Sequence, residues 1–301
     1  MTRTNPKIRH DCLKTRHPIS LLVFFACVIG LSMFSLQPIV LGISSLGSLF
    51  IYFRLCGGRK LLSHLKLMLI LAILTAIINP LFNHRGRTVL YRFKNGNSLT
   101  FEAIFYGFTA ALIVVSVLSW FAVFNYIFDS DKLLYVFGRF SPSFALTISM
   151  ALRFVPEFGR KAKEISRMNR LEYRNFGKKG FVARIKQGAA GLGALLTWAL
   201  EGSVKKAKSM RDRGFGRGKR TSYSIFRWQT EDTVLLVSTM VMMAVHIALS
   251  LLGAFDFWFY PVIYGRIFAA PALCGYVVLL LLMLLPAVFD MRMVGRRERR
   301  V

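Results

Sequence analysis

The sequence predicts an all-α fold: a polytopic membrane helix bundle of about six spans, with further long helices outside the bilayer. The 301 residues are 54% hydrophobic and have a mean hydropathy of +0.49, which is too apolar for an ordinary soluble domain. The formal net charge is nevertheless +27. A soluble nucleic-acid binder would carry such a charge without long apolar runs, so we expect a lipid bilayer and no nucleic acid as a partner.

The N-terminal part of the chain contains a basic tail, residues 1–18, and then transmembrane helices over residues 19–128. A helix that spans a core of roughly 30 Å needs about 20 apolar residues. The apolar runs are Ile19–Leu36, Pro38–Phe53, Leu67–Phe82 and Ala103–Phe128. No small-residue cleavage site follows the first run, so we interpret it as a retained helix and not as a signal peptide.

The C-terminal part repeats this organisation, with transmembrane helices over residues 233–290 and a basic tail at 291–301. Val234–Gly253 and Ala272–Phe289 are the two apolar runs. His246 is the titratable residue deep in a predicted span, and we interpret it as a packed histidine whose ring is hydrogen-bonded by a neighbouring helix. The four cysteines form no CxxC pair, so neither a metal nor another cofactor is predicted.

Between the two membrane parts, region 129–232 is strongly basic, with 19 Lys/Arg against five Asp/Glu between residues 153 and 220. From about Pro156 we expect a helix, because basic residues recur at steps of three and four and therefore share one face. These residues are Arg160, Lys163, Arg167, Arg170 and Arg174. The residues expected opposite them are Val155, Phe158, Ala162, Ile165 and Asn169. The apolar stretch 144–155 is expected to form a separate, half-buried helix.

A second helix of the same kind is expected from Leu192 to Arg213. Its apolar side is formed by Leu192, Leu196, Leu200, Ala207 and Met210. Gly214 follows as the left-handed residue that commonly closes a helix, and Asn175 is the next-best residue for that conformation at the end of the first helix. Each helix then ends with an arginine at its tip, Arg174 or Arg213. Two arginines in matching positions at helix ends suggest that both ends insert into a partner protein.

Small residues precede the second helix and form part of it. Gly188, Gly191, Gly193 and Ala194 are expected to let another helix approach closely, because small side chains permit close backbone contact.

Sites for bond-making chemistry are not apparent in the sequence. The stretch 214–219 resembles a phosphate-binding loop, but Arg213 stands at the position of its first glycine and Arg220 at that of the Ser/Thr that holds magnesium. One alternative is a membrane-bound enzyme acting on anionic lipid headgroups, although its candidate carboxylates are scattered: Glu157, Glu164, Glu172 and Glu201. Another alternative is a membrane protein that tethers nucleic acid, which would bind it with a steep salt dependence.

Several motifs together resemble a known family. The sequence has His17-Pro18 before the first apolar run and Asn79-Pro80-Leu81-Phe82-Asn83-His84-Arg85-Gly86 after the third. It also has Ala151-Leu152-Arg153-Phe154-Val155-Pro156 and Met210-Arg211-Asp212-Arg213-Gly214-Phe215. With these motifs the chain resembles the transmembrane T component of energy-coupling factor (ECF) transporters, the EcfT/CbiQ family.

The resemblance implies a scaffold subunit without enzymatic activity of its own. In that family, two Ala-Arg-Gly motifs end two cytoplasmic coupling helices and dock into two ABC-type ATPase subunits, while a small membrane S component captures a vitamin or a transition metal ion. The implied ATPase-coupling residues are Arg174, Asn175, Arg213 and Gly214, and the implied location is the prokaryotic plasma membrane. The second motif here, Asp212-Arg213-Gly214, keeps the arginine and glycine, whereas Tyr173-Arg174-Asn175 keeps only the arginine.

The distribution of Lys and Arg predicts the orientation of the chain. If both tails are cytoplasmic, six spans place region 129–232 in the cytoplasm as well, as the positive-inside rule requires. The loop that contains Arg85 and Arg92 is then the exception, because it lies outside.

We therefore expect a cysteine introduced near Lys179 to be protected from a membrane-impermeant thiol reagent in intact cells. Labelling should appear only after the membrane is permeabilised. Strong labelling in intact cells would reverse the predicted orientation.

Overall fold

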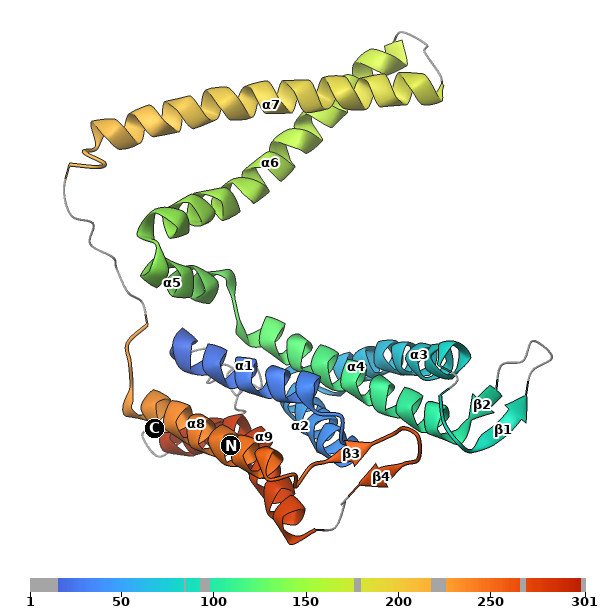
Figure 1. Ribbon diagram of the computed structural model, residues 1–301. Coiled ribbons are helices and arrows are strands. Elements are labelled where there is room, and N and C mark those ends of the chain that lie inside the picture. Colours follow the sequence, from blue (N-terminus) through green and yellow to red (C-terminus); the bar gives the residue numbers. More distant parts are fainter. Residues whose placement is uncertain are drawn as a thin grey trace, which may run out of the picture. The chain divides into compact units, whose positions relative to one another are not determined.

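The computed structural model describes residues 16–83, 85–92, 98–175, 180–217, 226–265 and 269–298. The chain divides into two compact units, residues 1–132 together with 226–301, and residues 133–225. Figure 1 shows the elements of both units, with colours that follow the sequence. Throughout the described ranges these elements are helices, apart from two short antiparallel hairpins.

Five helices of the first unit are long and apolar enough to cross a membrane. They are α2 (Pro38–Cys56), α3 (Gly58–Phe82), α4 (Phe101–Ile127), α8 (Thr230–Leu251) and α9 (Ala270–Glu298), the last through its stretch Ala270–Val288. The apolar helix α1 (Pro18–Phe34) has 17 residues and is shorter than a typical span of about 20. The predicted all-α, multi-pass membrane bundle is thus confirmed.

Helix α3 begins earlier than its apolar run predicts. Gly57 has φ +79° and separates α2 from α3, so the helix starts at Gly58 and not near Leu67. Its first turns therefore carry Arg59, Lys60 and Lys66. Long basic side chains can occupy such positions because their charged ends extend towards the membrane surface.

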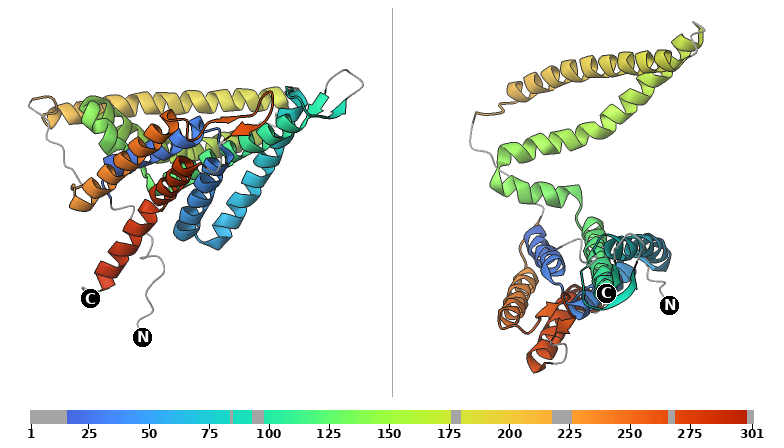
Figure 2. Two further views of the ribbon diagram at one scale, coloured as in Figure 1. Left: turned by 60° about the horizontal axis from the view of Figure 1, so that its bottom comes forward. Right: turned by 45° about the vertical axis from the view of Figure 1, so that its right-hand side comes forward.

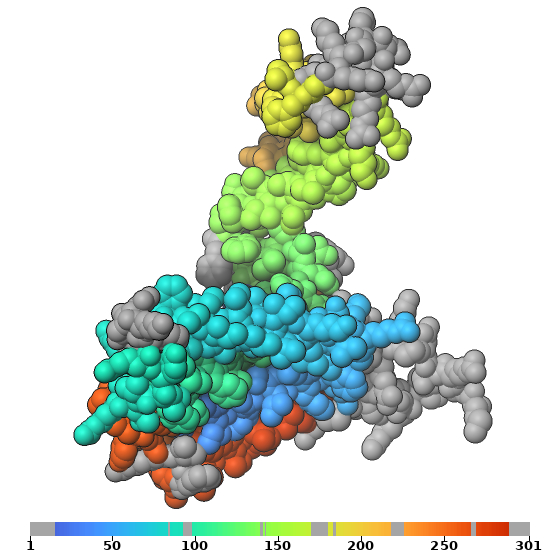
Figure 3. Space-filling model, turned by 90° about the vertical axis from the view of Figure 1, so that its right-hand side faces the viewer, coloured from blue at the N-terminus to red at the C-terminus, as the bar shows by residue number. Residues whose placement is uncertain are grey.

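The outer surface of α3 is apolar and exposed. Met68 and Pro80 are its buried residues, while apolar side chains on the rest of the helix remain accessible. The most exposed of these in mid-helix are Leu67, Leu69, Ile70, Ile73, Leu74 and Ile77. In Figure 3, α3 (light blue) lies across the visible face of the first unit. A surface of this kind suits the hydrocarbon of a bilayer, in which apolar exposure is not penalised.

The core of the first unit is built around Trp120 of α4. Its ring is fully buried and lies edge-on to Phe24 and Phe25 of α1, with centroid distances of 5.9 and 6.2 Å. Helices α2, α3 and α1 all pack against α4, and α9 packs against α2 and α8. Aromatic pairs with this geometry add to the stabilisation provided by buried area.

A cluster of hydroxyl groups joins the inner helices α1, α2 and α4. The Ser44 hydroxyl lies 2.7 Å from that of Ser32 and accepts hydrogen bonds from Ser116 at 2.8 Å and from the Trp120 indole at 3.0 Å. All four residues are buried. Small hydroxyl side chains let helices approach closely and replace the hydrogen bonds that lipid cannot supply.

The α3–α4 connection explains part of the Asn79–Gly86 motif. It contains β1 (Val89–Arg92) and β2 (Ser98–Thr100), which pair antiparallel. Glu102, in the first turn of α4, accepts hydrogen bonds from the backbone and hydroxyl of Thr88 at 3.1 and 2.8 Å. Gly86 has φ +141°, and a Cβ there would lie 2.6 Å from Glu102 Oε2, so only glycine fits. His84 of the motif lies outside the described residues.

The second hairpin connects α8 to α9. Strands β3 (Phe257–Trp258) and β4 (Tyr264–Gly265) pair antiparallel, and Phe257 packs against Phe259 with a centroid distance of 4.9 Å. The two hairpin connections contact one another, because the Arg87 amide donates to the Pro261 carbonyl at 3.1 Å and the Asn83 amide donates to the Tyr260 hydroxyl at 2.9 Å.

The second unit contains long helices that differ in extent from those predicted. Helix α5 (Ser130–Phe140) leads into it, followed by α6 (Pro142–Asn175) and α7 (Phe181–Asp212), which form a helical hairpin (Figures 1 and 2). The predicted start of α6 at Pro156 is wrong, and 144–155 is not a separate helix. Pro156 lies inside α6, where it removes one backbone donor but leaves the helix continuous. Likewise, α7 starts at Phe181 and not at Leu192.

We expect Gly86→Ala to lower the free energy of unfolding by about 1–3 kcal/mol, because a side chain there is both strained and in collision with Glu102. Thermal unfolding of the detergent-purified protein measures the effect. Gly42→Ala in α2 is the matched control, since a Cβ at Gly42 meets nothing within 4 Å. Equal melting temperatures for the two variants would contradict this explanation of the turn.

Candidate functional site: the basic hairpin and its exposed ends

The hairpin of α6 and α7 is held together by a small set of contacts along its length. The Phe158 ring of α6 lies edge-on to the Trp198 ring of α7, with a centroid distance of 5.7 Å. Further along, Lys206 Nζ of α7 lies 3.0 Å from Glu157 Oε2 and 3.8 Å from the centre of the Phe154 ring. The lysine thus forms an ion pair and a cation–π contact together, which fixes the register of the two helices.

The closest approach of α7 to α6 occurs at Gly191. A Cβ at this position would lie 3.1 Å from Asn169 Nδ2 and 3.8 Å from Ile165 Cγ2. Beside this contact is an open cavity of about 300 Å³, whose lining includes Ala162, Ile165, Asn169 and Gly191. The predicted side of α6 that includes these residues therefore faces α7.

The other three residues of α7 that the sequence predicts as packing positions are more accessible than Gly191. Gly188 lines the same cavity, but a Cβ at Gly188 or at Gly193 would meet nothing within 4 Å. Ala194 is exposed as well. Of this set, only Gly191 supports a close contact within the described part of the hairpin, which leaves the other three available to a partner.

The basic face of α6 is directed towards the surroundings. Arg160, Lys163 and Arg167 are exposed, as the predicted spacing requires. Lys161 lies beside this face and forms an exposed ion pair of 3.0 Å with Glu164. An exposed pair of this kind contributes little stability, so the charges of this face act chiefly as an electrostatic surface.

An exposed apolar stripe runs along α7 and borders the cavity beside α6 at Leu192. Leu192, Leu196 and Leu200 are 69%, 62% and 60% accessible, and Ile185 and Val204 extend the stripe towards both ends. The spacing of four and seven residues places these side chains together. The sequence predicts an apolar side here, and the structure adds that the described residues leave it uncovered.

The end of α7 has the geometry of a Schellman cap. Gly214 has φ +82°, its amide donates to the Arg211 carbonyl at 2.9 Å, and the Phe215 amide donates to the Met210 carbonyl at 3.0 Å. These are the two backbone bonds that define the motif. Arg213 is the residue immediately before the glycine, and its side chain is exposed. The predicted left-handed glycine is confirmed, and it holds Arg213 at a defined helix end.

The residues that would complete a cap at the end of α6, 176–179, lie outside the described residues. Asn175 is the last helical residue, and no described residue other than glycine has a positive φ, so the expected left-handed Asn175 is wrong. Arg174 occupies the last turn, while the side chains of Arg174 and Asn175 lie outside the described parts of the structure.

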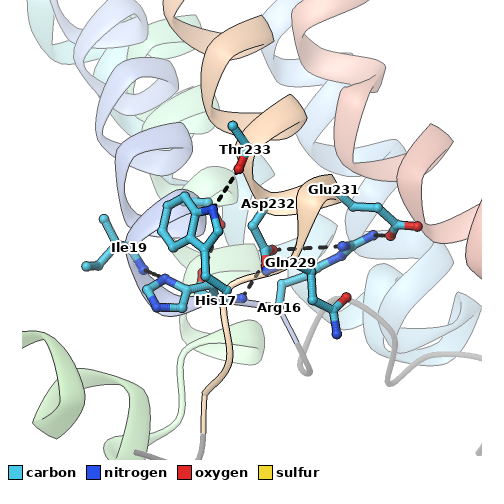
Figure 4. A network of polar contacts seen from close by, with 9 residues as sticks. Arg16, His17, Ile19, Gln229, Glu231, Asp232 and Thr233 are labelled. Atoms are coloured by element: carbon cyan, nitrogen blue, oxygen red, sulfur yellow. Dashed lines mark hydrogen bonds and ion pairs between the residues drawn. The ribbon is translucent and has the colours of Figure 1, made fainter.

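A polar network at the start of α8 has no counterpart in the sequence analysis. Arg16 forms an ion pair with Glu231 and lies 3.8 Å from Asp232, as Figure 4 shows. Asp232 also accepts the backbone amides of His17 at 3.3 Å and Gln229 at 3.1 Å. The network joins the N-terminal ends of α1 and α8. In the sequence, the sign of this network is the pair of adjacent acidic residues, Glu231 and Asp232, at the start of an otherwise apolar run.

Comparison with known proteins agrees with the family resemblance over part of the chain. No protein-family profile matches. A stretch of 93 residues is 33% identical to a protein of Lactobacillus helveticus (strain DPC 4571) named energy-coupling factor transporter transmembrane protein EcfT. The stretch covers 31% of this chain and 34% of that protein, so the match spans about a third of either length. The likeness is therefore to part of a transporter membrane component.

We expect Gly214→Ala to loosen the end of α7, because a side chain in the left-handed conformation costs about 1–2 kcal/mol. Hydrogen exchange of the amides at positions 214 and 215 should become faster. Gly202→Ala is the matched control, since it lies inside α7 with nothing within 4 Å of an added Cβ and should not speed exchange. Unchanged exchange in the 214 variant would show that the cap does not hold the helix end.

Proposed function

We propose that this chain is the transmembrane scaffold subunit of an ECF-type importer, a T component that couples two ABC-type ATPase subunits to a small S component. The observation that carries the proposal is the capped end of α7, which presents the exposed Arg213 at a rigid helix terminus. The partial likeness to a protein named as such a transmembrane component supports the same assignment. The proposal assigns no bond chemistry to the chain itself.

Arg213 and Arg174 are the proposed contacts with the ATPases. A guanidinium group presents a fixed fork of donors that suits bidentate pairing with a carboxylate. At the C-terminal end of a helix it is also favoured by the negative end of the dipole, by about 0.3–1 kcal/mol. An arginine that becomes desolvated in a groove can act as an interface anchor worth about 2 kcal/mol or more. Gly214 would shape the helix end around Arg213, and Asn175 is a proposed contact beside Arg174.

The sides of the hairpin are proposed to transmit the movement of the ATPases to the S component. The exposed stripe at Leu192, Leu196 and Leu200 offers apolar area for a membrane protein. Gly188, Gly193 and Ala194 lie open near the same end of α7, and their small size would let a partner helix approach and slide. The contacts of Trp198 and Lys206 with α6 support a hairpin that moves as one lever.

The proposed location is a prokaryotic plasma membrane, with residues 129–232 in the cytoplasm where the ATPases would be. The imported compound would be a vitamin or a transition metal ion, selected by the S component. The competing proposal of a lipid-headgroup enzyme is not favoured, because two of its candidate carboxylates are already paired with lysines. Glu157 pairs with Lys206, and Glu164 pairs with Lys161.

Affinity purification of the full chain in mild detergent, followed by mass spectrometry, tests the proposal. We expect two ABC-type ATPases and a small membrane protein to co-purify. Arg213→Glu should reduce recovery of the ATPases by about tenfold or more, as loss of an interface anchor with reversal of its charge implies. The double variant with Arg174→Glu should abolish uptake of the transported compound.

The matched control is Arg167→Glu on the exposed basic face of α6, which should leave ATPase recovery nearly unchanged. Membrane insertion should be normal in each variant, because Arg213 and Arg167 are both exposed. If the double variant still purified with both ATPases and supported uptake, the two arginines would be ordinary surface charges.

A further inference from the structure

A cavity of about 600 Å³ lies in the first unit, between the C-terminal halves of α1 and α8 and the β3 region. Its size falls within the range of small-molecule sites in proteins, about 300–1,000 Å³. Helix α1 contributes residues at intervals of three and four from Ala26 to Phe34, and α8 does the same from Met243 to Ser250. Two helix faces therefore line an elongated groove and not a spherical void.

The lining of the cavity is mostly apolar, and its serines and its carboxylate lie at one end. Ala26 and Met243 lie at the end nearer the middle of the two helices. Ser35, Ser250 and Asp256 lie at the end where both helices stop and the connections begin. An exposed Trp258 lines this polar end as well, and tryptophan is enriched where membrane and water meet. Polar side chains are therefore concentrated at one end of the cavity, as polar groups are concentrated at one end of a lipid molecule.

His246 lies between the two ends of the cavity and supplies a buried polar group. It is 6% accessible, and its ring stacks on Phe255 with a centroid distance of 4.5 Å. Its Nδ1 atom is buried and has no hydrogen-bond partner among the described residues, so the predicted bond from a neighbouring helix is not observed. An unpaired buried polar atom is unfavourable, and a ligand with a suitable polar group would remove this cost.

We propose that this cavity holds a resident membrane phospholipid. One acyl chain follows α1 and α8 towards Ala26 and Met243, the headgroup lies beside Ser250 and Asp256, and an ester or hydroxyl oxygen completes the bonding of His246. A neutral imidazole has one donor and one acceptor nitrogen, so such an oxygen suits it. The surroundings supply this ligand, because the unit is a multi-pass bundle whose helices cross the bilayer. The proposal does not depend on the ECF assignment.

Photo-crosslinking of the full chain in lipid nanodiscs tests this site. The probe is phosphatidylethanolamine with a diazirine at the end of one acyl chain, chosen because the Asp256 carboxylate would repel an anionic headgroup. Crosslinks should concentrate on peptides that contain Ala26 and Met243, and excess unlabelled phosphatidylethanolamine should suppress them. Crosslinks spread evenly over the exposed apolar helices, α3 included, would overturn the proposal.

Gly30→Leu tests whether the cavity itself is needed. Gly30 lines the cavity and an added Cβ there meets nothing within 4 Å, so the leucine fills the groove without disturbing the helix. We expect crosslinking at Met243 to fall by about tenfold, as for overfilling of a packed site. Gly42→Leu is the control, because its position has equal room and does not line this cavity. Equal crosslinking in the two variants would contradict the proposal.

His246→Phe tests the polar contact separately. The substitution retains an aromatic ring beside Phe255 and removes both nitrogens. If an oxygen of the lipid bonds to His246, crosslinking at Met243 should fall by about fivefold, as for the loss of one net hydrogen bond. A histidine that only packs predicts equal or stronger crosslinking, because the cavity becomes more apolar. That result would overturn the role assigned to His246.

Discussion

The requirement that every buried backbone group be hydrogen-bonded governs the polar chemistry of this chain. Helices satisfy it internally in an apolar medium, but the first amides and last carbonyls of each helix need other partners. At the start of α8, Asp232 accepts two backbone amides and is balanced by Arg16. At the start of α4, the Thr100 hydroxyl accepts the Ala103 amide while Glu102 accepts from Thr88. Buried charge in the bundle is thus concentrated at helix ends.

The two units use their helix ends in different ways. The ends in the membrane bundle are buried and joined to neighbouring segments, as Arg16 and Glu102 illustrate. The end of α7 is completed by its own backbone around Gly214 and needs no neighbour. The cap therefore does not require the side chain of Arg213, which stays exposed. A self-contained cap is therefore well suited to present a charged group to another protein.

The sequence predicts those features that depend on local pattern. Apolar runs locate the bundle, and Gly214 follows a periodic segment at the position where only glycine is easily left-handed. Prediction from the sequence fails where contacts between residues distant in the chain determine the structure. The charges of Arg16 and Asp232 are far apart in the chain but meet in space. Pro156 is a local signal for a helix start, yet α6 continues through it. The cavity at His246 likewise depends on how α1 and α8 pack, which no single segment reveals.

Two exposed apolar surfaces in this chain require different explanations. The surface of α3 belongs to a helix that is apolar enough to cross the bilayer, so hydrocarbon suffices to cover it. The stripe on α7 belongs to a helix that also carries Lys186, Lys205 and Lys208 and does not qualify as a span. Contiguous apolar area on a charged helix marks an interaction site, because water covers it poorly. The stripe would supply the buried area of an interface, and Arg213 its charge specificity. The hairpin is therefore suited to form one side of the proposed assembly.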